Sequence, residues 1–409
     1  MATRIIKLYL WLKMGTTLAT SLHFSIYVSF LLQNKLNFLE VSLVNAFFML
    51  AVFLLETPTG AVADLFGRKT SYVLASLVNG LGFVLYSQVN TFWLFVCAEV
   101  VIALGHTLES GAFKAWLVDS LYYYQYDGDL IGVFNKAQRY TKIVTGIGAV
   151  AGAYLGQYDM SLSLLAGGLF YLVISFLSWL LMKEEYWQTR SINRHSWWQN
   201  IQSTIVISMQ KGWQCLGIRQ IIIVFTVCAF CYQPLNMYWQ PHFGQYLATK
   251  YYGYIFVGII VFSLAGNEVI TLLTRRNIAA NWLKLINLLI IGCGCIGAAV
   301  WQPLFWTLLF YLLHEMGRGM LDVYYDVQLH QQIDSEQRAT IDSFVSMMRT
   351  GGACLGLLLF GWLANQTSIR FTWLLAGVII GLSSLPAVWK RFVRQSKICY
   401  TSKTSDDHV

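Results

Sequence analysis

Long apolar stretches separated by short polar connections run through most of the chain. In the first half they lie at about 14–33, 41–63, 70–89, 92–118, 139–157 and 162–182. In the second half they lie at about 220–241, 252–274, 282–300, 303–326, 341–364 and 370–389. A helix needs ~20 mostly apolar residues to cross the hydrocarbon core of a bilayer. The pattern therefore predicts an all-α membrane protein with twelve transmembrane helices.

Composition agrees with lipid as the main solvent. Of the 409 residues, 56% are hydrophobic and 12% are charged, whereas soluble domains carry roughly 25% charged residues. The connections are too short for a soluble domain. The basic start and first apolar stretch are similar to a signal peptide, but no clear cleavage site follows and many more spans do, so we expect this helix to be retained.

The distribution of basic residues predicts the orientation. If both termini are cytoplasmic, 22 of the 28 Lys and Arg residues lie in inner connections, and only Lys35, Lys250 and Arg370 lie outside. Such a bias follows the positive-inside rule. Because the basic residues are spread over all the inner connections, the net charge of +8 reflects membrane topology, and we expect no nucleic-acid partner.

The longest inner connection divides the chain into two halves. The predicted organisation is a six-helix bundle at 1–182, a cytoplasmic linker that could carry an amphipathic helix at 183–219, a second six-helix bundle at 220–390 and a short cytoplasmic tail at 391–409. A shift of 207 residues places Asp119 on Asp326 and the basic pair after span 2 on the pair after span 8. Such repeats are typical of transporter architectures, although two matches could be coincidence.

The cysteines suggest packing rather than chemistry. Cys228 and Cys231 form a C-x-x-C pair and Cys293 and Cys295 a C-x-C pair, but each lies in an apolar span without companion ligands. Small buried cysteines commonly behave as hydrophobic residues. We therefore expect no metal site and no cofactor, and no nucleophile or cofactor motif indicates an enzyme.

The connection from span 2 to span 3, residues 56–70, carries the most specific motif, and we call it the signature loop. Its residues Gly60, Asp64, Gly67, Arg68 and Lys69 fit G-x-x-x-D-x-x-G-R-K, the signature of the major facilitator superfamily. A phosphate-binding loop is excluded because its Lys must directly follow the second Gly. The chain thus resembles a transporter of this superfamily, in particular bacterial permeases of the drug and metabolite efflux type.

The resemblance implies a fold and an inner gate. The fold is two six-helix bundles that rock around a central substrate site. In the family, the Asp of the motif meets the inner end of span 11, here Ser335–Thr340, and the Arg meets an acid at the inner end of span 4, here Asp119. Gly60 would allow close helix packing, and Gly67 a turn closed to other residues. The alternative is a plain basic loop set by topology.

Two further segments support the resemblance, and several departures weaken the assignment to drug export. The segment Ser110–Asp119 and the pair His314–Glu315 resemble patterns of efflux-type permeases. However, Thr107 stands where proton-coupled drug exporters usually have Arg, and span 5 lacks their Gly-Pro motif. The copy of the signature loop in the second half is also degenerate.

Ionisable residues inside the predicted spans are candidates for function. Each costs roughly 3 kcal/mol near mid-bilayer. Span 4 carries Glu99, His106, Glu109, Lys114 and Asp119, and span 10 carries His314, Glu315, Arg318, Asp322 and Asp326. Our hypothesis is that Glu109 or Glu315 binds and releases a proton, with His106 or His314 nearby, while Arg318 attracts or balances negative charge. The alternative is a static ion-pair network, in which Arg349 also pairs with an acid.

Aromatic and amide side chains are further candidates for a substrate cavity. Pro234 is expected to break the helix of span 7. The break would present Tyr232, Gln233, Asn236 and Trp239. His23 in span 1 is another candidate. Tyr and Trp near helix ends are also common at the membrane interface, so both interpretations stay open.

The function that fits best is a secondary active transporter that exports a small organic or amphipathic compound by alternating access, driven by protons. It would act as a monomer in a bacterial cytoplasmic membrane, with a small-molecule substrate and a proton or other ion as partners. A second interpretation is proton-coupled uptake or exchange of an amino acid, sugar or siderophore. An interpretation of another class is a membrane receptor that does not transport.

Overall fold

The computed structural model describes residues 1–186, 216–331, 333 and 338–384, and all regular structure within these ranges is helical. These residues fall into two compact units. Unit 1 comprises Met1–Ile192 together with Gln240–Ile260, and unit 2 comprises Asn193–Trp239 and Val261–Val409. Most of the predicted linker at 183–219 and the predicted tail at 391–409 lie outside the described residues.

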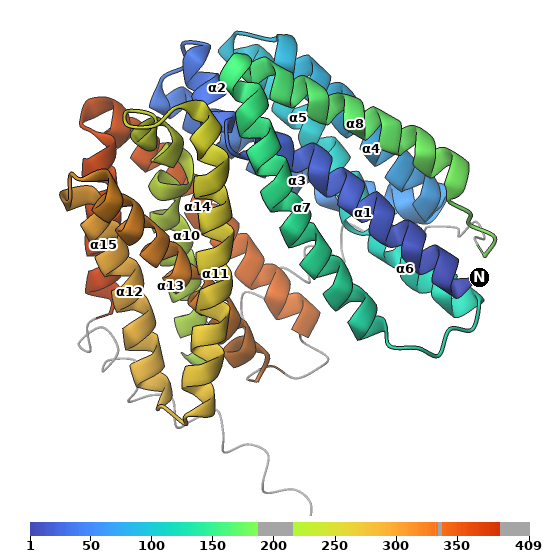
Figure 1. The fold of residues 1–409 in the computed structure, drawn as a ribbon. Helices are drawn as coiled ribbons and strands as arrows, with labels where there is room; N and C mark the ends of the chain where they lie inside the picture. The colour runs from blue at the N-terminus through green and yellow to red at the C-terminus, as the bar shows by residue number, and fades with distance from the viewer. Residues whose placement is uncertain (187–215, 332, 334–337, 385–409) are drawn as a thin grey trace, which may run out of the picture. The chain divides into compact units, whose positions relative to one another are not determined.

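Unit 1 is built from the helices of the first half. They are α1 (Ala2–Phe24), α2 (Tyr27–Gln33), α3 (Phe38–Phe66), α4 (Arg68–Gln88), α5 (Phe92–Ser110), α6 (Ala112–Tyr123), α7 (Leu130–Tyr158) and α8 (Met160–Leu181). Helix α4 packs against α5 and α8, α1 packs against α7 and α8, and α3 packs against α5 (Figure 1). Unit 1 therefore combines a contact between consecutive helices, α4 and α5, with contacts between helices that are distant in sequence.

Local sequence explains where helices of unit 1 begin and how closely they approach. Asn37 and the third helical residue, Glu40, form a capping box at the start of α3, which satisfies two otherwise free backbone donors. At the contact between α1 and α7, a Cβ on Gly152 would overlap the carbonyl group of Leu22. Only glycine fits this crossing.

The first predicted span is two helices rather than one. Helices α1 and α2 meet at Ser25–Ile26 and are bent by 45° relative to each other. The amide of Gln240 satisfies the backbone groups that the break leaves free. Its oxygen accepts from the N–H groups of Val28 (2.9 Å) and Ser29 (3.1 Å), and its nitrogen donates to the carbonyl of Phe24 (2.9 Å). The fourth span is likewise interrupted at Gly111.

The helices of the second half are α10 (Leu216–Phe243), the short 3₁₀ helix η1 (Thr249–Tyr251), α11 (Tyr252–Arg275), α12 (Ala280–Val300), α13 (Leu304–His330), α14 (Arg338–Gln366) and α15 (Ile369–Ser383). Helix α12 packs against both α13 and α15. The end of α10, η1 and the start of α11 belong to unit 1, and the rest belongs to unit 2.

The prediction that Pro234 breaks the helix of span 7 is wrong. Helix α10 continues from Leu216 to Phe243 through this residue. A proline deprives the carbonyl one turn earlier of its bond, and membrane helices tolerate this where neighbouring groups compensate. A separate bond runs from the indole of Trp373 in α15 to the carbonyl of Pro234 itself at 3.0 Å, and it fixes the proline against α15.

Helices occupy all twelve predicted apolar stretches as far as the structure describes them. Eight described helical segments are long and apolar enough to cross a membrane by themselves, and the bent α1–α2 pair adds a ninth. The number of twelve spans and the cytoplasmic position of both termini stay predictions.

Candidate functional site

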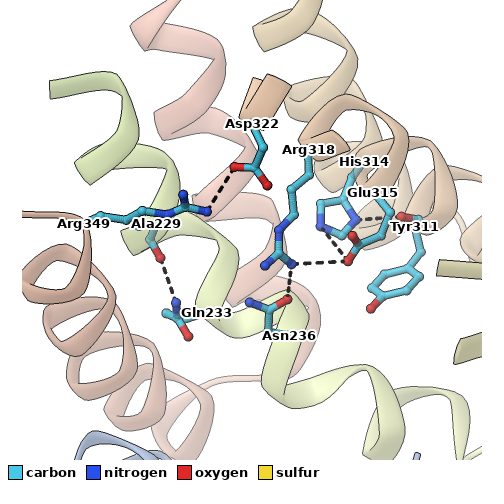
Figure 2. A network of polar contacts seen from close by, with 9 residues as sticks. All are labelled: Ala229, Gln233, Asn236, Tyr311, His314, Glu315, Arg318, Asp322 and Arg349. Atoms are coloured by element: carbon cyan, nitrogen blue, oxygen red, sulfur yellow. Dashed lines mark hydrogen bonds and ion pairs between the residues drawn. The ribbon is translucent and has the colours of Figure 1, made fainter. Parts of the chain in front are cut away.

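The centre of unit 2 holds a buried histidine and carboxyl pair on α13, shown in Figure 2. The side chains of His314 and Glu315 are 0% and 4% exposed. The Nδ1 atom of His314 lies 2.6 Å from the carbonyl oxygen of Tyr311. A carbonyl can only accept, so Nδ1 carries hydrogen. The other nitrogen, Nε2, then faces Oε1 of Glu315 at 3.7 Å.

The two groups lie close together without a hydrogen bond between them. A neutral imidazole with hydrogen on Nδ1 presents a lone pair at Nε2. This atom lies 3.7 Å from Oε1 of Glu315, which is longer than a hydrogen bond, and it has no hydrogen-bond partner among the described residues. The pair stays a candidate for proton binding.

Arg318 lies one turn further along α13 and supplies positive charge to the pair. Its guanidinium is 3.7 Å from Oε1 of Glu315 and donates to the amide oxygen of Asn236 on α10 at 2.7 Å. The guanidinium also lies over the ring of Tyr232, 5.1 Å from its centre. Arg318 is 30% exposed, so part of it remains accessible. We call His314, Glu315, Arg318, Asn236 and Tyr311 the Glu315 network.

The other cavity candidates on α10 are less accessible to solvent than Arg318, or are bonded within their own helix. Tyr232 and Trp239 are each 3% exposed, and the amide of Gln233 donates to the carbonyl of Ala229 in its own helix. Of the predicted cavity residues on α10, Asn236 accepts a hydrogen bond from Arg318 (Figure 2). Tyr232 contacts Arg318 through the face of its ring.

A second ion pair in unit 2 joins α13 to α14. Arg349 donates to Asp322 at 3.0 Å, and both side chains are about 40% exposed. The acid expected to pair with Arg349 is thus Asp322. Arg349 also lies over the ring of Phe225, so this pair has the character of a helix-to-helix tie.

The candidates of span 4 do not form one site. Glu109 accepts from Lys13 on α1 at 3.0 Å, with side-chain exposures of 16% and 34%. His106 is exposed, and its ring packs 6.0 Å from that of Phe48. His23 stacks near Phe83. The described contacts of Glu109 and His106 are thus with other residues, and that His106 assists Glu109 stays a prediction.

The signature loop is held by contacts within unit 1. Arg68 pairs with Asp119 at 2.6 Å, as the resemblance implies. Asp64 and Ser335–Thr340 have no described side chains, so their contact lies outside the described residues. A Cβ at Gly60 would meet nothing within 4 Å.

Gly67 has the backbone geometry that its motif position demands. Its φ and ψ are 89° and 154°, a region that is essentially restricted to glycine. The following helix, α4, begins at Arg68. The carboxylate of Glu184 accepts from the N–H groups of Arg68 (2.8 Å) and Lys69 (3.0 Å), where a helix N-terminus favours negative charge.

Residues next to Glu184 fix the same region. The carbonyl of Lys183 accepts from the indole of Trp116 at 2.9 Å, and the hydroxyl of Tyr186 donates to the carbonyl of Trp116 at 3.4 Å. Burial raises the pKa of the Tyr186 phenol, so this hydroxyl keeps the hydrogen that it donates. The segment after α8 is thereby tied to both α6 and the signature loop.

Comparison with known proteins decides the family. Residues 11–357 match the family model described as Major Facilitator Superfamily. The chain belongs to the Major Facilitator Superfamily. It is therefore a multi-pass membrane protein of a transporter family.

Known superfamily proteins similar to this chain differ widely in sequence. The chain is 24% identical over 261 residues to the uncharacterised MFS-type transporter YxaM of Bacillus subtilis (strain 168), and this match spans 63% of the chain and 62% of the relative. Solved structures include a mutant of the nucleoside transporter NupG (16% identity, TM-score 0.74, covering 95% of this chain and 99% of that one). Another is the xylose transporter XylE from E. coli (13%, 0.65, 95% and 96%). At these identities the structures show the fold alone.

Three residues that make contacts within unit 1 were not identified by the sequence analysis. Glu184 follows α8 in a charged segment, Gln240 lies in an aromatic run, and Tyr27 lies in an apolar stretch. Each acts by contacting a backbone or side chain more than 70 positions away. Sequence spacing on one helix gives no signal for such partners.

Proposed function

We propose that this protein is a proton-coupled exporter of a small organic or amphipathic compound, working by alternating access in a bacterial cytoplasmic membrane. The observation that supports the coupling is the His314–Glu315 pair, in which Nε2 of a buried imidazole lies 3.7 Å from Oε1 of a buried carboxyl. A carboxyl that is buried and paired with an imidazole can take up and release a proton during a cycle.

Arg318 links the proton to the substrate in this proposal. It contacts Glu315 and Asn236 and remains partly exposed. Protonation of Glu315 removes a negative charge beside the guanidinium, which then offers a stronger attraction to an electronegative group of a substrate. Glu109 receives no coupling role, because its pairing with Lys13 favours a static tie within unit 1.

The signature loop serves as the inner gate in the same proposal. The Arg68–Asp119 pair and the Glu184 carboxylate hold the start of α4 in place. In this proposal the start of α4 is the immobile part of the gate, and other elements move against it as the gate opens and closes.

Uptake of a polar nutrient is the second candidate. It is supported by the departures from the drug-exporter pattern, and by the similarity in fold to a nucleoside transporter and a xylose transporter. The same network could couple a proton to inward movement, so direction must come from experiment.

The test is reconstitution of the full-length protein in liposomes with an internal pH indicator. Drugs, nucleosides, amino acids and sugars are added in turn to vesicles with a pH gradient. Proton movement that depends on a compound is expected, and its direction in vesicles of known orientation separates export from uptake.

Two variants locate the coupling group. Glu315→Gln should abolish proton movement driven by the substrate while preserving substrate exchange, because the amide mimics the neutral acid. Asp322→Asn, on the same helix, is the matched control and should retain coupling. Retention of pH-driven transport by Glu315→Gln would refute the proposed coupling role.

A further inference from the structure

Two carboxyl groups are more than nine-tenths buried among the described residues, and they lie in different units. Glu315 in unit 2 is 3% exposed and Glu99 in unit 1 is 6% exposed. Glu315 has the guanidinium of Arg318 beside it. Glu99 instead accepts a hydrogen bond from the neutral hydroxyl group of Tyr27. The second carboxyl therefore lacks the balancing charge of the first.

The surroundings of Glu99 come from four helices. Tyr27 at the start of α2 donates to Oε1 of Glu99 at 2.6 Å. The hydroxyl oxygen of Tyr27 accepts from Nδ2 of Asn45 on α3 at 3.0 Å and from the hydroxyl of Tyr86 on α4 at 3.3 Å. We call Glu99, Tyr27, Asn45 and Tyr86 the Glu99 cluster. On α1, His23 is the nearby titratable group, with its ring 6.0 Å from that of Tyr27.

The Glu99 cluster contains no balancing cation. Tyr27 gives its only hydrogen to Glu99, and its oxygen accepts from Asn45 and Tyr86. None of the ion pairs among the described residues involves Glu99. The carboxyl is therefore buried against neutral groups.

We infer that Glu99 is a second proton-binding site, located in unit 1 beside the break between α1 and α2. An ionised carboxylate without a cation is costly in a buried site, and a proton removes that cost. Tyr27 begins α2 directly after the break at Ser25–Ile26. Loss of the proton strengthens the hydrogen bond that Tyr27 donates to Glu99, so the charge of Glu99 acts on the residue that begins α2.

The break is a built feature on which such a change can act. Gln240 holds the N–H groups of Val28 and Ser29 and the carbonyl of Phe24, and the hydroxyl of Ser25 donates to the carbonyl of Ala149 on α7 at 2.8 Å. Glu99 contacts a side chain at the start of α2, whereas Gln240 contacts backbone groups there. Protonation of Glu99 thus changes one side-chain contact of a short helix whose first backbone groups are held by Gln240.

The protonation itself can be tested without any substrate. Infrared spectroscopy of the full-length protein in lipid films, titrated with pH, should show a carbonyl band of a protonated carboxylic acid that disappears as pH rises. The band should be absent in Glu99→Gln, present in Glu315→Gln, and lost at a different pH in Tyr27→Phe. Glutamine can still accept from Tyr27, so the fold should persist. Absence of a Glu99 band, or a band that persists at every pH, overturns the inference.

The link to the break needs a second measurement. Hydrogen exchange of the Val28 and Ser29 amides is compared between the wild type and Glu99→Gln at each pH, which cancels the intrinsic pH dependence. Slower exchange in the wild type is expected only above the pH at which the band disappears, because the ionised carboxylate holds Tyr27 more strongly. Equal exchange throughout would overturn the link.

The consequence for transport rests on the proposed proton coupling. With two proton-binding carboxyls, Glu99→Gln should lower the number of protons moved per substrate, whereas Glu315→Gln should abolish coupling. If the protein moved no protons with its substrate, the infrared band of Glu99 would still be expected. The transport assay therefore tests the proposed function, and the infrared titration tests the proton site at Glu99. An unchanged proton count in Glu99→Gln, together with normal transport, would exclude the second site from the cycle.

Discussion

The two glycines of the signature loop should respond in opposite ways to the same substitution. Gly67 adopts a backbone conformation that other residues enter at a cost of about 1–3 kcal/mol. A Cβ there would also lie 2.7 Å from Oε2 of Glu184 and displace that carboxylate from two backbone N–H groups. Hydrogen bonds to a charged group contribute roughly 1.5 kcal/mol or more each. Gly67→Ala should therefore destabilise unit 1 by about 2–5 kcal/mol.

Gly60 provides the matched control in the same motif. It lies inside α3, and a Cβ there meets nothing within 4 Å. Alanine is favoured over glycine in a helix by up to about 1 kcal/mol, so Gly60→Ala should be neutral or slightly stabilising. The free energy of unfolding is measured for both variants by titration with sodium dodecyl sulfate in mixed micelles.

A third variant separates the two causes of the loss. Glu184→Ala removes the carboxylate without straining the backbone. Because Gly67→Ala already displaces Glu184, the double variant should be destabilised by less than the two single losses together. Equal stability of Gly67→Ala and Gly60→Ala would refute the reasoning about both strain and displacement.

Three other substitutions test contacts that shape the units. Gly152→Ala should sharply lower the yield of monodisperse protein in fluorescence-detected size exclusion, because its Cβ overlaps the backbone of Leu22; wild-type yield would contradict this. Asn37→Ala should cost about 1 kcal/mol in the detergent titration by removing a helix cap, whereas Asn37→Asp should cost less. Trp373→Phe should cost about 1 kcal/mol through loss of the indole bond to the Pro234 carbonyl, and no change would mean that another group replaces it.

The fold class and the membership in a transporter family could be predicted from sequence because each depends on local information. The apolar stretches are continuous, and the signature loop is a contiguous motif from Gly60 to Lys69. The Arg68–Asp119 contact followed from the resemblance and is present. The comparisons then confirmed the family directly.

The candidate site was predictable as a set of residues but less so as a set of contacts. His314, Glu315 and Arg318 share one helix, so their spacing placed them together. Glu109 and His106 also share a helix, yet Glu109 contacts Lys13 on another helix and His106 faces away. Which partner an ionisable side chain contacts depends on which helix packs against its own helix. The composition of a single span does not contain that information.

Pro234 and Gln240 show that helix breaks are also hard to predict from sequence. Pro234 was expected to break α10, but the helix continues through it, and the indole of Trp373 donates to the carbonyl of the proline. The real break lies at Ser25–Ile26, where no proline occurs, and a side-chain amide from residue 240 completes it. In a membrane interior, the partner that satisfies a freed backbone group decides whether a helix bends, and that partner can be anywhere in the chain.

The bond from Gln240 to the first span has a consequence for biosynthesis. Three backbone groups between Phe24 and Ser29 find their partner only in residue 240. During translation, the earliest helices leave the ribosome and enter the bilayer while this partner does not yet exist. Chains commonly fold from the N-terminus as they emerge, but here the first span must wait for more than half of the polypeptide. Until then it needs water, lipid headgroups or an insertion factor to cover its exposed backbone.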